Sequence, residues 1–179
     1  MRLQAIFYRG HDPQWAFLPL SGDGAKAKGG RFNPIGVPAL YLGATINTVI
    51  VEMTHGFAHR LQPLTMVSYD VDVDDVIDLR NAASRRTARV KLADMRCPWE
   101  LDLTYGRVPA SWRIANQLRK TSAGILVPSF ANGARKDMHN LVLWTWGPAL
   151  PHRVTVHDPR GRLPKDQQSW GARSGDETR

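Results

Sequence analysis

Two neighbouring segments of the sequence have different hydrophobic periods, and together they restrict the fold more than any other feature. In residues 45–58 the apolar side chains recur at the i, i+3, i+4, i+7 spacing of an amphipathic helix, with Thr45 as the N-cap. In residues 67–73 valine and tyrosine alternate with serine and aspartate, which is the period of a strand that buries one face. A helix and a half-buried strand so close together predict the α+β class.

The rest of the sequence predicts further strands and helices in mixed order. Short apolar runs predict strands at residues 3–8, 39–42, 76–79, 124–127, 141–146 and 153–156. Helical patterns occupy residues 84–95 and 109–120, and Pro109 suits the first turn of the second helix. Residues 9–38 are rich in glycine and proline and predict one long loop, which usually means a functional loop. We therefore expect mixed sheets with flanking helices.

Length and cysteine content indicate a single intracellular domain. At 179 residues the chain is long enough for one domain with its own core, which we place at residues 1–157. Residues 158–179 contain few apolar side chains and predict a flexible or partner-ordered tail. Cys97 is the only cysteine, and no apolar stretch is long enough to span a bilayer or to act as a signal peptide. We expect a cytoplasmic protein that does not contact membranes.

The net charge of +8 favours anionic partners such as nucleic acids, phosphates, nucleotides or acidic proteins. The basic residues are scattered, and the densest group, in residues 85–91, has no aromatic interleaving of the kind that binds single strands. A solvated helix face explains that group, so direct nucleic-acid binding is not expected. A basic nucleic-acid-binding module remains the alternative that the charge allows.

The motif G-G-R-F-N-P at residues 29–34 presents Arg31 beside two glycines. The glycines remove side-chain bulk, so that backbone can lie against a ligand, and the guanidinium offers a planar fork of donors to a phosphate or pyrophosphate. The sequence has neither a Walker loop nor the dinucleotide fingerprint G-x-G-x-x-G. By themselves, these six residues fit an ordinary turn with a surface arginine equally well.

Glu52 lies on the predicted 45–58 helix, roughly 120° from the centre of its apolar stripe. Its carboxylate can face a cleft from there, although most glutamates at such positions are simply solvated. His55 and His59 share this flank, which makes a metal-dependent hydrolase built on Glu52, His55 and His59 a second alternative. The order E-x-x-H-x-x-x-H differs from the metalloprotease motif and has no second Glu-x-x-His, so no metal site is expected.

Three further residues have weaker signals. Ser129 follows a predicted buried strand, where functional side chains are often presented, but it lacks the flanking glycines of a nucleophilic serine. Tyr41 ends a short apolar run and could stack on a nucleobase or a nicotinamide, although such a tyrosine is more often a core residue. Arg9 follows the first predicted strand and could be only an edge charge.

The combination and order of these residues resemble the RES-domain family, which is named for its Arg, Glu and Ser. The resemblance begins at Tyr8 and Arg9, continues through G-G-R-F-N-P, Tyr41 and Glu52, and extends past Ser129 to about residue 146. Where many relatives have tryptophan after the arginine, this chain has phenylalanine, which preserves an aromatic ring. The resemblance implies an ADP-ribosyltransferase-like fold.

The resemblance also implies site residues. Arg31, Glu52 and Ser129 are the signature residues and the expected catalytic group. Arg9 and Tyr41 join Arg31 and Ser129 as expected contacts to the bound substrate. Glu52 would stabilise positive charge on the ribose, and the two arginines would bind phosphates. Tyr41 would stack on the bound ring, and Ser129 would orient Glu52 or hold the nicotinamide side. No metal is implied.

The function implied by the resemblance is that of a toxin from a bacterial toxin–antitoxin pair whose substrate is NAD. Members of the family hydrolyse or phosphorolyse NAD, or they transfer its ADP-ribose to a protein. The expected partner is an antitoxin with a helix-turn-helix DNA-binding region, which blocks the active site and makes any DNA contact. The sequence leaves open whether water, phosphate or a protein accepts the ADP-ribose.

Overall fold

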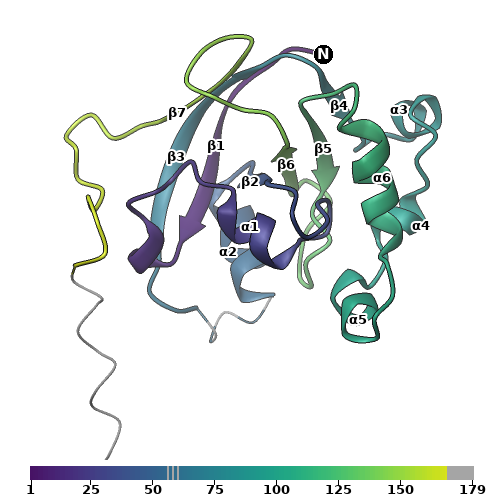
Figure 1. Cartoon of the computed structure of the whole chain (residues 1–179), viewed down its shortest axis with the longest axis horizontal. Helices are drawn as coiled ribbons and strands as arrows, with labels where there is room; N and C mark the ends of the chain where they lie inside the picture. The colour runs from purple at the N-terminus through teal and green to yellow at the C-terminus, as the bar shows by residue number, and fades with distance from the viewer. Residues whose placement is uncertain (56, 58, 60, 169–179) are drawn as a thin grey trace, which may run out of the picture.

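The structure, a computed structural model, describes residues 1–55, 57, 59 and 61–168 (Figure 1). Its centre is a seven-stranded sheet in the order β4-β5-β6-β2-β1-β3-β7. The strands are β1 (Leu3–His11), β2 (Leu40–Gly43), β3 (Thr65–Val73), β4 (Val76–Asp78), β5 (Gly124–Pro128), β6 (His139–Leu143) and β7 (His152–Val156). Neighbouring strands are antiparallel except for β4 and β5, which run parallel.

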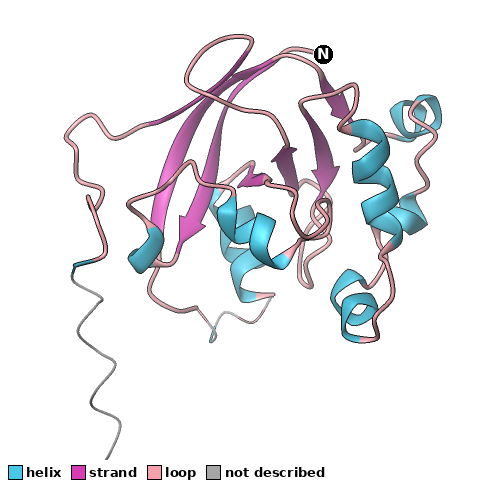
Figure 2. Cartoon of the chain, in the orientation of Figure 1, coloured by secondary structure: helices cyan, strands magenta, loops and turns pink. Residues whose placement is uncertain are grey.

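Short helices flank this sheet, and the predicted α+β class is confirmed (Figure 2). They are η1 (Pro13–Trp15), α1 (Asp23–Lys28), α2 (Ile46–Thr54), α3 (Ala82–Thr87), α4 (Leu92–Met95), α5 (Trp99–Thr104) and α6 (Ala110–Leu118). In Figure 1, α3 to α6 gather beside β4 and β5, whereas α1 and α2 lie near the short strand β2. No helix in the described ranges has the length and apolar character that a membrane crossing needs.

The strands bury side chains on both faces of the sheet, in two separate cores. In the first core, Phe7 of β1 and Tyr69 of β3 meet Leu141 of β6, so the two halves of the sheet pack over a common interior. The second core lies on the other face of β5 and β6, where Met95 of α4 and Ile114 of α6 cover it. This division follows from the alternation of side chains along each strand.

Strands β1 and β2 pair only briefly, and α2 packs against both of them. Within these two fully described strands the pairing consists of one position, Tyr8 opposite Gly43. A side chain at Gly43 would put its Cβ 2.7 Å from Val49 Cγ2, so only glycine lets α2 approach this closely. The Thr45 hydroxyl accepts a hydrogen bond from Thr48 N at 3.0 Å, which confirms the predicted N-cap.

Helix α2 ends earlier than the sequence predicts. Its last residue is Thr54, and His55 adopts the left-handed conformation, with φ of 50°, that commonly closes a helix. The predicted range 45–58 is therefore too long, because the apolar periodicity continues beyond the point where the backbone turns. Residues 56 and 58 lie outside the described residues.

Several other predicted boundaries were wrong. The 9–38 segment is not one loop, because β1 continues to His11 and both η1 and α1 follow. The predicted helix at 84–95 is divided into α3 and α4 by Arg89, which has a φ of 54°. Pro109 is the N-cap of α6 rather than part of its first turn, and β6 begins at His139 and ends at Leu143. Helix α5 was not predicted, because so short a helix buries little and has no clear apolar stripe.

Part of the segment after residue 157 contacts the domain. The Asp158 carboxylate accepts hydrogen bonds from the backbone N–H groups of Arg162 and Leu163, and Leu163 packs against the first core. Further along, the Gln167 side chain donates to Gln14 O at 3.2 Å. Residues 169–179 lie outside the described residues, and the domain boundary at 157 stays a prediction.

His11 is expected to make the stability of the fold depend on pH. Its Nε2 lies 2.6 Å from the Tyr69 hydroxyl, which itself donates to Pro19 O at 2.8 Å. Burial, together with the nearby Arg9 charge, lowers the pKa of His11 to about 4. An unfolded histidine titrates near pH 6.5, so its depressed pKa means that folding favours the neutral ring. We expect this contribution to the free energy of unfolding to be at its maximum above pH 6.5. The free energy should fall by up to about 3 kcal/mol as the pH drops towards 4.

Urea unfolding at intervals between pH 4 and pH 7 measures this loss. His11→Gln is the control, because glutamine keeps a donor near the Nε2 position without titrating. The variant should lose markedly less stability than the native chain over the same interval. Equal slopes for the two proteins would assign the pH dependence to other groups.

Candidate active site

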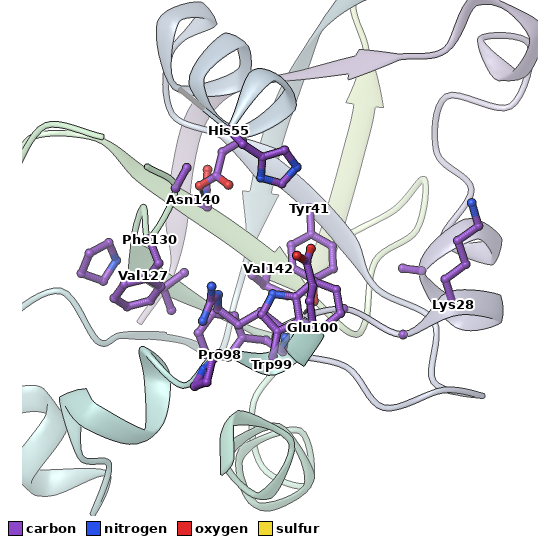
Figure 3. A pocket seen from close by; sticks show the side chains of 18 of the residues that line it. Lys28, Tyr41, His55, Pro98, Trp99, Glu100, Val127, Phe130, Asn140 and Val142 are labelled. Atoms are coloured by element: carbon purple, nitrogen blue, oxygen red, sulfur yellow. Dashed lines mark hydrogen bonds between the residues drawn. The ribbon is translucent and has the colours of Figure 1, made fainter. Parts of the chain in front are cut away.

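A cavity of about 580 Å³ lies beside β2, within the size range typical of sites for small molecules and cofactors (Figure 3). Its walls come from α1, α2, α5 and the facing ends of β5 and β6. Three of the predicted site residues, Arg31, Tyr41 and Glu52, line it together. The guanidinium and the carboxylate, 21 positions apart in the chain, thus face one space.

Two side chains hold the Glu52 carboxylate. Ser129 Oγ donates to Glu52 Oε1 at 2.7 Å, and Asn140 Nδ2 donates to the same oxygen. The pairing of Val127 with Asn140 between β5 and β6 brings these two donors to the same end of the sheet. Glu52 Oε2 accepts no hydrogen bond from any residue that the structure describes, so this oxygen is available to a ligand.

Arg31 connects the cavity to the segment between α4 and α5. Its Nη1 donates to Met95 O at 3.2 Å and to Cys97 O at 2.7 Å, and its Cζ lies 5.2 Å from the centre of the Phe130 ring. Across the described residues, its Nε and Nη2 have no hydrogen-bond partner and its guanidinium forms no ion pair. Burial lowers the pKa of Arg31, but an arginine stays charged at neutral pH. Its remaining donors are therefore available to an anion.

The Tyr41 hydroxyl holds the turn that presents Arg31. It accepts a hydrogen bond from Phe32 N at 2.9 Å and donates to Asn33 Oδ1 at 2.7 Å. The Asn33 amide in turn donates to Ala25 O at 2.8 Å, which attaches the turn to α1. Burial raises the pKa of Tyr41, so the hydroxyl stays protonated. The ring of Tyr41 forms part of the cavity wall (Figure 3).

Gly30 is the tightest point of this turn, and Gly30→Ala should destabilise it. A Cβ at Gly30 would lie 2.6 Å from Asn33 Oδ1 and 2.7 Å from the Tyr41 hydroxyl oxygen. We expect a loss of about 1–3 kcal/mol in the free energy of unfolding, measured by denaturant titration. Gly24→Ala on α1 is the matched control, because a Cβ there meets no atom within 4 Å. Equal stability of the two variants would contradict the role given to Gly30.

The other two predicted site residues lie beside the cavity rather than in its wall. Ser129 reaches the site through Glu52, and its Oγ also accepts a hydrogen bond from Ala131 N at 3.4 Å. Arg9 lines an adjoining space of about 200 Å³ that shares Tyr41 and Glu52 with the main cavity. Its Nη1 donates to Ser21 O at 3.0 Å, and burial lowers its pKa.

The structure gives the alternative of a metal-dependent hydrolase less support than the sequence does. Because α2 ends at Thr54, His55 and His59 do not follow Glu52 on one helical face. His55 lines the cavity, and the His59 ring contacts Phe57, with ring centres 5.9 Å apart. No group of three or more metal-ligand side chains comes together within the described ranges.

Sequence reasoning missed three residues that support the site. Asn140 is the second donor to Glu52, Phe130 lies against Arg31, and Trp112 Nε1 donates to Gly30 O at 2.8 Å. Nothing local in the sequence marks them, because each belongs to an element that only the tertiary fold brings to the cavity. The register of β5 against β6, which places Asn140 near Ser129, is seen only in the structure.

Comparisons with known proteins identify the family and the fold. Residues 6–166 match the sequence model of the RES domain, a range that contains all five predicted site residues. A solved structure described as the M. tuberculosis MbcT–MbcA toxin–antitoxin complex contains a chain of similar fold. The TM-score is 0.54 at 21% sequence identity, and the match covers 88% of this chain and 84% of that chain. None of the curated proteins matches this sequence. Because the family match spans most of its length, the chain belongs to the RES-domain family.

Proposed function

We propose that this protein is a toxin of a toxin–antitoxin module and that it cleaves NAD at the bond between nicotinamide and ribose. The observation that carries the proposal is the arrangement of the Glu52 carboxylate. One of its oxygens accepts hydrogen bonds from two side chains, and the other oxygen remains available in a cavity that Arg31 also lines. The family match and the similar fold in a toxin–antitoxin complex support the same conclusion.

The chemistry of the bond explains why a carboxylate is needed. When the ribose C1′–nitrogen bond breaks, its electron pair goes to the nicotinamide nitrogen, which becomes neutral, and positive charge develops on the ribose. In the proposed reaction, the Glu52 carboxylate accepts hydrogen bonds from ribose hydroxyls and stabilises that charge. An acceptor oxygen then forms the new bond to C1′, and a water acceptor releases one proton. The leaving group needs no protonation.

In the proposed reaction, the other site residues bind the substrate or position Glu52. The Arg31 guanidinium has free donors in its planar fork, which suits the pyrophosphate of NAD. Ser129 and Asn140 are positioning residues, because they act on the substrate through Glu52. Tyr41 offers its ring as a stacking surface in the cavity wall. We assign a second phosphate contact to Arg9, which borders the adjoining space.

The proposal includes a partner. The similar solved structure is described as a toxin–antitoxin complex, and we infer a cognate antitoxin with a helix-turn-helix region that covers the cavity of this chain. Such an antitoxin would make the DNA contacts itself, and the pair would act in the cytoplasm. A protein that receives ADP-ribose remains a possible second partner.

The test is to incubate the purified chain with NAD that is labelled in its adenosine half, in buffer, in buffer with phosphate, and with cell lysate. We expect release of nicotinamide, and the position of the label identifies the acceptor. Free ADP-ribose indicates water, a phosphorylated ADP-ribose indicates phosphate, and labelled polypeptide indicates a protein. Intact NAD in all three arms, with a chain that is folded by circular dichroism, would overturn the proposal.

A further inference from the structure

A second carboxylate faces the cavity, and the proposed cleavage does not use it. Glu100 is exposed on α5 and lines the cavity together with Trp99, which is half-buried. In the view of Figure 3, these two side chains lie across the cavity from His55 and Asn140, which mark the Glu52 end. The structure gives Glu100 no salt-bridge partner within the described residues.

Arg31 interacts electrostatically with both carboxylates. Both Glu52 and Glu100 favour the charged guanidinium and partly offset the lowering of its pKa by burial. The hydrogen bond from Arg31 Nη1 to Cys97 O also fixes the chain just before α5, so it places the first turn of α5 beside the guanidinium. The cavity wall therefore contains one guanidinium and two carboxylates that both affect its charge, Glu52 from α2 and Glu100 from α5.

A dinucleotide has the matching arrangement of groups, because its central pyrophosphate carries a ribose at each end. With the pyrophosphate at Arg31 and the nicotinamide ribose at Glu52, the adenosine ribose comes to the α5 side. A carboxylate suits the 2′- and 3′-hydroxyls of a ribose, since it can accept a hydrogen bond from each. The same carboxylate repels a 2′-phosphate, and the neighbouring Trp99 ring offers a stacking surface for a base.

We propose that Glu100 binds the adenosine ribose of the substrate and thereby makes this protein select NAD over NADP. This inference rests on the proposed function, since it names the specificity of the same site. Lys28 is a second cation on the cavity wall, besides Arg31, and it could oppose this selection by accepting a 2′-phosphate. The proposal assigns the discrimination to Glu100 alone, so removal of Lys28 should affect the two dinucleotides equally.

The test compares kcat/KM for NAD and for NADP in the native chain and in Glu100→Gln, Glu100→Arg and Lys28→Gln. We expect Glu100→Gln to reduce the preference for NAD by about 10-fold or more, because the repulsion of the 2′-phosphate and the bond to the 2′-hydroxyl both weaken. Glu100→Arg should reverse the preference, whereas Lys28→Gln should leave it unchanged. Asp94→Asn on α4, outside the cavity lining, is the control for loss of one negative charge.

A second measurement does not depend on turnover. Isothermal titration with ADP-ribose and with its 2′-phosphate should show tighter binding of ADP-ribose to the native chain and equal or reversed binding to Glu100→Arg. If the native chain cleaves NAD but both Glu100 variants keep its preference, the specificity inference is wrong and the proposed function stands. If the native chain cleaves neither dinucleotide, the proposed function is wrong, and equal binding or no binding of the two ADP-ribose ligands removes the inference as well.

Discussion

Glu52→Gln is expected to lower kcat for NAD cleavage by about 10²- to 10³-fold, which is the usual effect of removing one well-placed electrostatic group. Glutamine has the shape of glutamate and keeps an oxygen that can accept the hydrogen bonds from Ser129 Oγ and Asn140 Nδ2. It lacks the negative charge that stabilises the developing positive charge on the ribose. Because that charge appears only in the transition state, KM should change little.

Two comparisons make this result specific. Asp70→Asn removes a carboxylate charge from an exposed position of β3 and should retain the native kcat. Ser129→Ala removes one of the two donors to Glu52 but leaves Asn140, so we expect a smaller loss than that of Glu52→Gln. Steady-state release of nicotinamide measures all three variants, each shown to be folded by its urea unfolding curve. A Glu52→Gln variant with more than a tenth of the native kcat would exclude the role assigned to the carboxylate.

The strands and the main helices could be predicted where one face of an element is buried. The alternation in residues 67–73 marks β3 because Val67, Tyr69, Val71 and Val73 point into the core from that strand. The apolar periodicity likewise marked α2, in which Val49 is buried although Ile46 and Met53 of the same stripe are exposed. The short helices α1 and α5 gave no comparable signal, because none of their side chains is buried. Periodicity reports burial, so elements that bury nothing remain invisible to it.

The site residues likewise fall into those that the sequence marks and those that only the tertiary structure reveals. Arg31 and Glu52 could be selected in the sequence, and the structure brings both to one cavity. The single-residue signals were weak, and the order of several residues along the chain identified them. Asn140 and Glu100 could not be selected, because their importance depends on which element lies across the cavity from them. That arrangement depends on contacts between residues far apart in the sequence, such as the pairing of β1 with β2 and the hydrogen bond from Arg31 to Cys97 O.

Arg31→Lys is expected to reduce kcat/KM for NAD by about 10- to 100-fold although the charge is kept, which is the range for losing hydrogen bonds to a charged group. The arginine fork can hold Cys97 O with Nη1 and still offer Nε and Nη2 to a pyrophosphate. A lysine has one compact ammonium, so it cannot serve the backbone carbonyl and both phosphates in the same geometry. The loss should fall mainly on KM, since the pyrophosphate is bound equally before and during bond cleavage.

Nicotinamide riboside separates the two tasks of Arg31. It contains the same bond to be cleaved but has no pyrophosphate, so its cleavage by Arg31→Lys should be within about threefold of its cleavage by the native chain, since only the phosphate contact is lost. A selective loss with NAD therefore assigns the guanidinium to the pyrophosphate. Equal losses on both substrates would mean that Arg31 acts by holding the segment from Met95 to Cys97 in place, and that another cation binds the phosphates.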